Sequence, residues 1–92
     1  MATKASSEST GQRILVVDDE NSISDLIATS LKFVGFDVRT AANGSQALTI
    51  AEEFKPHAMI LDVMLPDLDG FEVCRQIRNE GIEVGVLFLS AK

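Results

Sequence analysis

An apolar run ends abruptly in acid at Ile14-Leu15-Val16-Val17-Asp18-Asp19-Glu20, and this stretch decides the fold. The run Met59-Ile60-Leu61 ends in the same way, at Asp62. Short runs of β-branched and aliphatic residues are typical of buried strands in a parallel sheet. If both strands lie in one such sheet, their carboxyl ends meet at one edge, where open α/β sheets bind ligands. We therefore expect Asp18, Asp19 and Asp62 to lie close together.

Three carboxylates at one edge repel each other unless a proton or a cation joins them. Mg²⁺ is the expected cation, because it prefers oxygen ligands and commonly acts together with phosphate. For Asp18-Asp19-Glu20 alone, a solvated acidic turn that caps a helix would be the simpler interpretation. The addition of Asp62 and of the loop Pro66–Gly70 favours a metal site instead.

Strand and helix patterns alternate along the chain, which indicates βαβ crossovers and a parallel sheet. The four expected strands are Arg13–Val17, Phe36–Ala41, Ala58–Leu61 and Val84–Leu89. The first helix is expected to begin at the capping-box pattern Ser22-Ile23-Ser24-Asp25 and to end at Gly35. The second follows Asn43-Gly44 and stops before Pro56.

The third expected helix begins with Asp69 and Glu72 in capping-box spacing and ends at Gly81. Its side chains at Phe71, Cys74 and Ile77 are expected to face the core.

Composition excludes several classes of protein. A chain of 92 residues, 46% of them hydrophobic, allows one small domain with a core. A net charge of −6 with scattered Lys and Arg argues against nucleic-acid binding by this segment. No apolar run approaches the ~20 residues of a membrane span, and a single cysteine is typical of a cytoplasmic protein. We expect a flexible polar tail over residues 1–12 and one domain over residues 13–92.

With these motifs in place, the chain resembles a bacterial response-regulator receiver domain of a two-component system. The resemblance rests on ILVVDDE at Ile14–Glu20, MILDVMLPDLDG at Met59–Gly70 and LFLSAK at Leu87–Lys92, and it covers Arg13–Lys92. It implies a flavodoxin-like α/β fold with strand order 2-1-3-4 and a phosphoryl group accepted from a sensor histidine kinase. It also implies that the protein is a phosphoacceptor, which assists its own phosphorylation and dephosphorylation but is not a classical enzyme. The third helix is similar to those of regulators with a winged-helix DNA-binding domain, which implies a transcription factor as the parent protein.

The resemblance also implies roles for single residues. Asp62 matches the phosphoacceptor, and Ser90 matches the switch hydroxyl that turns toward the phosphoryl oxygen. Asp18 and Asp19 match the acid pair that holds Mg²⁺ or Mn²⁺, with Asp19 as a direct ligand and Asp18 acting mainly through water. Met64 would give its backbone carbonyl to the metal. General chemistry agrees, because a carboxylate can form an aspartyl phosphate and a metal ion neutralises the transferred oxygens.

One departure from the family concerns a lysine at the end of a fifth strand, which pairs with the phosphoryl group. Lys92 does not match it, because Lys92 directly follows Ser90-Ala91, and the sequence stops before the expected fourth helix, fifth strand and fifth helix. Slow or absent phosphorylation of the 92-residue chain is therefore expected.

Two other classes of function share features with this sequence. The missing lysine leaves open a phosphorylation-independent interaction module with the same fold. A haloacid-dehalogenase type of hydrolase is disfavoured, because such enzymes carry a second aspartate two residues after the nucleophile, where this chain has Met64.

The strand order implied by the family would make Val84–Leu89 an edge strand that is apolar on both faces. Each large apolar side chain of this strand that stays fully exposed to water would lower the free energy of unfolding by roughly 1.5–3 kcal/mol. The total stability of a typical domain is only ~5–15 kcal/mol. We therefore expect self-association through this strand, a domain swap or partial unfolding.

Overall fold

The structure is a computed structural model that describes residues 11–89. Its elements are β1 (Arg13–Val17), α2 (Asn21–Phe33), β2 (Asp37–Ala41), α3 (Gly44–Phe54), β3 (Ala58–Asp62), α4 (Gly70–Asn79) and β4 (Gly85–Leu89). The strands form one parallel sheet in the order β2-β1-β3-β4, which confirms the expected α/β fold class and strand order. Ser90, Lys92 and residues 1–10 of the expected tail lie outside the described residues. None of the helices described is long and apolar enough to cross a membrane.

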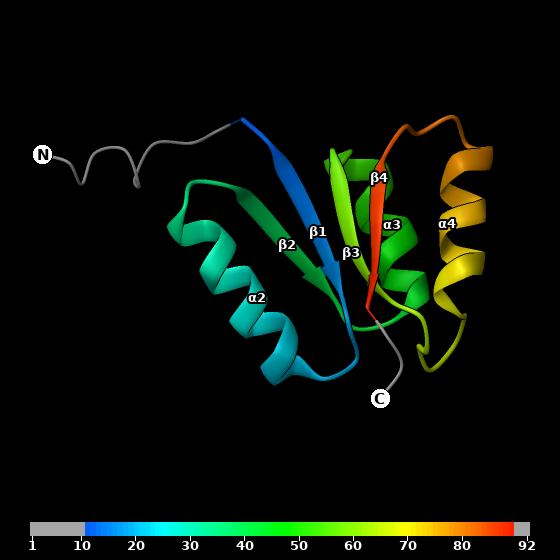
Figure 1. Cartoon of the computed structure of the whole chain (residues 1–92). Helices are drawn as coiled ribbons and strands as arrows, with labels where there is room; N and C mark the ends of the chain where they lie inside the picture. The colour runs from blue at the N-terminus through cyan, green and yellow to red at the C-terminus, as the bar shows by residue number, and fades with distance from the viewer. Residues whose placement is uncertain (1–10, 90–92) are drawn as a thin grey trace, which may run out of the picture.

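Helices cover both faces of the sheet, α2 on one face and α3 with α4 on the other (Figure 1). The arrangement follows from β1, because successive side chains of a strand point to opposite faces. Ile14 and Val16 pack with Ala28 of α2. Leu15 and Val17 belong to the larger core, under α3 and α4. All strands run the same way, so the strand ends that precede the three expected acids meet at one edge.

The predicted start of the first helix is wrong by a few residues. Helix α2 begins at Asn21, its N-cap is Glu20, and no side chain caps it, so Ser22 lies inside the helix. The cause is a turn at the end of β1, where Asp18 Oδ1 accepts a hydrogen bond from the Glu20 N–H at 2.9 Å. At the other end the prediction is right, because Gly35 has φ +104°, the left-handed conformation that glycine adopts easily.

The inward face of α4 differs in part from the prediction. The capping box is present, since Asp69 Oδ1 accepts a hydrogen bond from the Glu72 N–H at 2.8 Å. Cys74 and Ile77 are buried, but Phe71 is 59% exposed and is not a core residue. The ring of Phe71 instead lies against the ring of Phe88 on β4, with centroids 4.7 Å apart.

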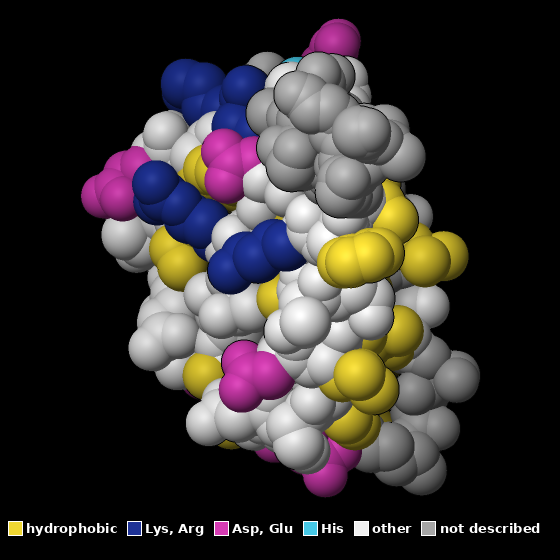
Figure 2. Space-filling view, turned by 90° about the vertical axis from the view of Figure 1, so that its left-hand side faces the viewer, with side chains coloured by type: hydrophobic (Ala, Val, Ile, Leu, Met, Phe, Trp, Pro, Cys, Tyr) yellow, Lys and Arg dark blue, Asp and Glu magenta, His cyan; other side chains and the backbone are white. Residues whose placement is uncertain are grey.

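The two edge strands differ in how they meet solvent. The β2 edge carries Asp37 and Arg39, both exposed, and the face of the molecule in Figure 2 mixes basic and acidic side chains. Strand β4 has no charged residue; Leu87 is 62% exposed and Phe88 36% exposed. Val84 was expected to lose its cover, yet it lies before the strand and is buried.

A groove of about 300 Å³ runs beside β4 on the α2 face of the sheet. Its lining is apolar and includes Ile14, Leu31, Phe36, Ala58, Ile60 and Leu87. An apolar, uncharged edge next to such a groove is a template for another strand, whereas the charges on β2 oppose such pairing.

We expect two copies of the chain to associate through β4, and Leu87→Lys to weaken this association because a charge on an edge strand opposes pairing. Sedimentation at high micromolar concentration should show a roughly two-fold fall in mean mass for Leu87→Lys. The matched control is Leu26→Lys on α2, where Leu26 is 69% exposed. Wild-type protein that is monomeric, with slowly exchanging amides over Gly85–Leu89, would contradict this expectation.

Candidate functional site

The register of the sheet brings the acids together. Val17 is paired with Leu61, so the residues that follow them, Asp18 and Asp62, are neighbours across adjacent strands. The Asp18 N–H donates to the Ala41 carbonyl at 3.1 Å, which also ties the end of β1 to the end of β2. Asp18, Asp19 and Asp62 each offer one carboxylate oxygen, and these oxygens all lie within 4.8 Å of one another.

Two of the three carboxylates are buried. Asp62 is 0% exposed and Asp18 is 1% exposed, whereas Asp19 is exposed. Asp18 accepts the Glu20 N–H described above, and Asp62 Oδ1 accepts the Met64 N–H at 3.1 Å. Burial of a carboxylate is costly unless charge or hydrogen bonds compensate it. Three carboxylates this close together repel one another, and a cation bound among them would relieve that repulsion.

The donor set fits a hard divalent cation. All three donors are carboxylate oxygens, they lie close enough together to hold a metal ion, and Mg²⁺ prefers oxygen ligands of this kind. Mn²⁺ accepts the same kind of oxygen ligands. Met64, whose carbonyl the family resemblance implies as a ligand, lies two residues after Asp62 and is 63% exposed. Its role stays a prediction. Ser90 lies outside the described residues, so its predicted role stays a prediction.

The chain after Asp62 folds back on itself. Gly70 N–H donates to the Val63 carbonyl at 2.8 Å, and Met64 and Asp69 form an antiparallel bridge. Gly70 is required here, because a Cβ at that position would lie 2.6 Å from the Asp62 carbonyl oxygen. We call the stretch from Val63 to Asp69 the acceptor loop.

Asp67, at the tip of the acceptor loop, is a residue to which the sequence patterns assign no role of its own. Its Oδ1 accepts hydrogen bonds from the Gly44 N–H at 2.7 Å and the Leu68 N–H at 2.8 Å. Its Oδ2 accepts from the Ser45 N–H at 2.9 Å. The amide of Gly44, followed by that of Ser45, lowers the pKa of the Asp67 carboxyl from 3.8 to about 2. The partners lie 23 and 22 positions away in sequence, so no local pattern could have found this contact.

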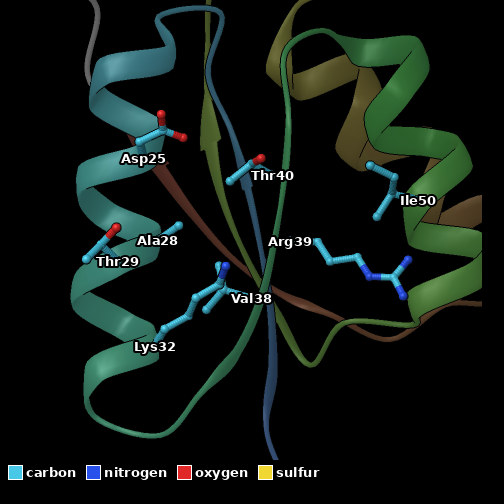
Figure 3. Close-up of a pocket in the computed structure, with 8 residues that line it drawn as sticks. All are labelled: Asp25, Ala28, Thr29, Lys32, Val38, Arg39, Thr40 and Ile50. Atoms are coloured by element: carbon cyan, nitrogen blue, oxygen red, sulfur yellow. The ribbon is translucent and has the colours of Figure 1, made fainter.

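A second hollow, of about 500 Å³, lies between α2 and the β2 edge (Figure 3). Its lining includes the basic residues Lys32 and Arg39, but Figure 3 shows their side chains on opposite sides of β2. Arg39 instead places its guanidinium carbon 4.7 Å from the centre of the Phe54 ring. The polar groups of this hollow do not converge, so the acidic cluster remains the candidate site.

Comparisons with known proteins all point to one family. Residues 14–92 match the sequence pattern of the response regulator receiver domain. The chain is 51% identical, over 81 residues, to the alkaline phosphatase synthesis transcriptional regulatory protein PhoP of Bacillus subtilis; the match covers 88% of this chain and 34% of that protein. It is 45% identical, over 80 residues, to the response regulator MprA of Mycolicibacterium vanbaalenii, covering 87% and 35%. The chain thus spans about a third of the length of these curated relatives.

The fold is also similar to a solved structure of the response regulator protein TrrA from Thermotoga maritima in complex with Mg²⁺ and BeF. The TM-score is 0.80 at 36% identity, and the match covers 88% of this chain and 70% of that one.

Asp19→Asn is expected to raise the thermal stability of the metal-free protein, because it removes one of three crowded charges. Unit charges ~4 Å apart near water interact by about 1 kcal/mol, which corresponds to a rise in melting temperature of about 4 °C. The same variant should lose most of the stabilisation that millimolar Mg²⁺ gives the wild type. Circular dichroism can follow both effects, since the chain has no Trp or Tyr for fluorescence. Asp25→Asn, on the exposed face of α2, is the control for net charge. Equal rises in melting temperature in both variants would show that repulsion within the cluster is not the cause.

The contribution of Asp67 to stability is expected to depend on pH. A carboxyl whose pKa is lower in the folded state stabilises the fold above its unfolded pKa, near 3.8, and loses that effect as the pH falls toward about 2. Urea unfolding of wild type and Asp67→Asn should therefore differ most at neutral pH and converge in strong acid. An NMR titration in which the Asp67 carboxyl has a pKa of 3.8 or higher would contradict this.

Proposed function

The chain belongs to the response regulator receiver domain family, and on that premise we propose that Asp62 accepts a phosphoryl group from a sensor histidine kinase with the help of Mg²⁺. The observation that carries the proposal is the convergence of Asp18, Asp19 and Asp62 within 4.8 Å at the carboxyl edge of the sheet. Membership in the family supports the reaction class, and the carboxylate cluster supports the need for a cation.

In the proposed reaction, a carboxylate oxygen of Asp62 attacks the phosphorus of the donor. An O–P bond forms as the P–N bond to the kinase histidine breaks, and the imidazole leaves with a proton from solvent. Asp19 is the exposed member of the cluster, so the donor approaches from its side. Asp62 is 0% exposed, so the groups that cover its carboxylate must move aside before attack.

The acids beside Asp62 would hold the cation. We assign Asp19 as a direct ligand, Asp18 as a ligand through water, and the carbonyl of Met64 as a further donor. A bound Mg²⁺ supplies charge that stabilises the transferred phosphoryl oxygens. Ser90 is proposed as the switch hydroxyl that reports the phosphorylated state.

The two curated relatives are, by name, a transcriptional regulatory protein and a response regulator. We propose that the protein to which this chain belongs is likewise a cytoplasmic transcription regulator, controlled by the phosphorylation of Asp62. The full burial of Asp62 keeps one alternative open, a receiver fold that binds partners without being phosphorylated.

Incubation of the longer protein to which this chain belongs with acetyl phosphate and Mg²⁺ should give a retarded band on a phosphate-affinity gel. Asp62→Asn should abolish that band, because the amide cannot act as the nucleophile. Asp19→Ala should weaken Mg²⁺ binding more than Asp18→Ala, because only the first removes a direct ligand.

Asp25→Asn, on exposed α2, is the control that should leave the band unchanged. A band that survives Asp62→Asn, or that survives removal of Mg²⁺ with EDTA, would refute the assignment. Equal Mg²⁺ affinity of wild type and Asp19→Ala, by calorimetry, would refute the ligand role.

A further inference from the structure

The acceptor loop is fixed at both its base and its tip. At the base, Met64 N–H donates to Asp62 Oδ1, and Gly70 N–H donates to the Val63 carbonyl. At the tip, the Asp67 carboxylate accepts the amides of Gly44 and Ser45, which are the first two residues of α3. The loop therefore joins the end of β3 to a helix that comes earlier in the chain.

The contact between loop and helix is close. A Cβ added at Gly44 would lie 2.9 Å from Leu68 Cβ and 3.1 Å from Asp67 Oδ1. A real Cβ does not approach that near, so a larger residue would push the loop tip away from α3. Gly44 and the Asp67 hydrogen bonds therefore have the same effect, because both allow α3 and the loop tip to lie close together.

Charge adds to this contact. The N-terminus of a helix carries partial positive charge and unpaired amides, which favour a carboxylate. Asp67 supplies a carboxylate with hydrogen bonds to two of those amides, and the lowered pKa keeps it ionised at neutral pH. Hydrogen bonds to an ionised acceptor are stronger than those between neutral groups.

We propose that Asp67 is a positioning residue for the phosphoacceptor site: its carboxylate anchors the acceptor loop on α3 and so fixes Met64 beside Asp62. The proposal rests on the proposed function, because it concerns the geometry of the same site. Asp67 acts through the loop, because its carboxylate accepts hydrogen bonds from the amides of Gly44, Ser45 and Leu68.

A purely structural role must be separated from this one, because Asp67 also caps α3. Asn43 provides the matched comparison, since its side chain accepts a hydrogen bond from the Gln46 N–H at 2.8 Å and caps the same helix end. Asn43→Ala removes a cap of α3 without cutting the link to the acceptor loop. The effects of Asp67→Ala and Asn43→Ala can therefore be compared at equal loss of thermal stability.

The first measurement is Mg²⁺ affinity by calorimetry. We expect Asp67→Ala to weaken Mg²⁺ binding on the order of 10-fold, the usual effect of groups that orient metal ligands. Asn43→Ala should leave the affinity within about two-fold of wild type. Gly44→Ala should act like Asp67→Ala, although alanine is favourable inside a helix, because it separates the same two surfaces.

The second measurement is amide exchange of Met64 and Gly70, the two hydrogen-bonded amides at the base of the loop. Both should exchange at least several-fold faster in Asp67→Ala and Gly44→Ala, but not in Asn43→Ala. This readout needs no cation, so it judges the anchor even if wild-type protein binds no Mg²⁺ and the proposed function fails. Unchanged exchange in Asp67→Ala, or equal changes in affinity for Asp67→Ala and Asn43→Ala, would overturn the proposal.

Discussion

Repulsion among three carboxylates is the constraint on which the rest of the site depends. Asp18, Asp19 and Asp62 place oxygens within 4.8 Å of one another, and two of these side chains are buried. The parallel register of β1 and β3 brings Asp18 and Asp62 together, because Val17 and Leu61 are paired and these two acids follow them directly. Asp19 is the next residue of the chain after Asp18. Clustered carboxylates lower the stability of a fold unless a cation neutralises them. Clusters of this kind are therefore typical of functional sites.

The acceptor loop turns this crowded edge into a defined site. It leaves β3 at Asp62, is fixed to α3 at Asp67, and returns to the start of α4 at Gly70. Two glycines permit the close approaches, one against the Asp62 carbonyl and one against Leu68. The helix α3 thus helps to shape the site although it contributes none of the three acids.

Sequence patterns predicted the strands and the acidic edge, because each depends on a local run of apolar residues and the acid after it. The strand order came from the family resemblance. The patterns failed where a contact between distant residues decides the outcome. Phe71 has the spacing of a core residue, yet it lies at the open β4 side and meets Phe88 instead. Ser22 has the form of a cap, but the Asp18 turn starts the helix earlier. The anchor at Asp67 joins residues 23 positions apart, which no local pattern records.

The central claim is that the longer protein to which this chain belongs accepts phosphate at Asp62 and not at Asp18 or Asp19. The most direct measurement is reduction of the acyl phosphate with borohydride after treatment with acetyl phosphate and Mg²⁺, followed by tandem mass spectrometry of the peptides. Homoserine is expected at position 62, and only when Mg²⁺ is present. Homoserine at position 18 or 19, or its formation without any divalent cation, would contradict it.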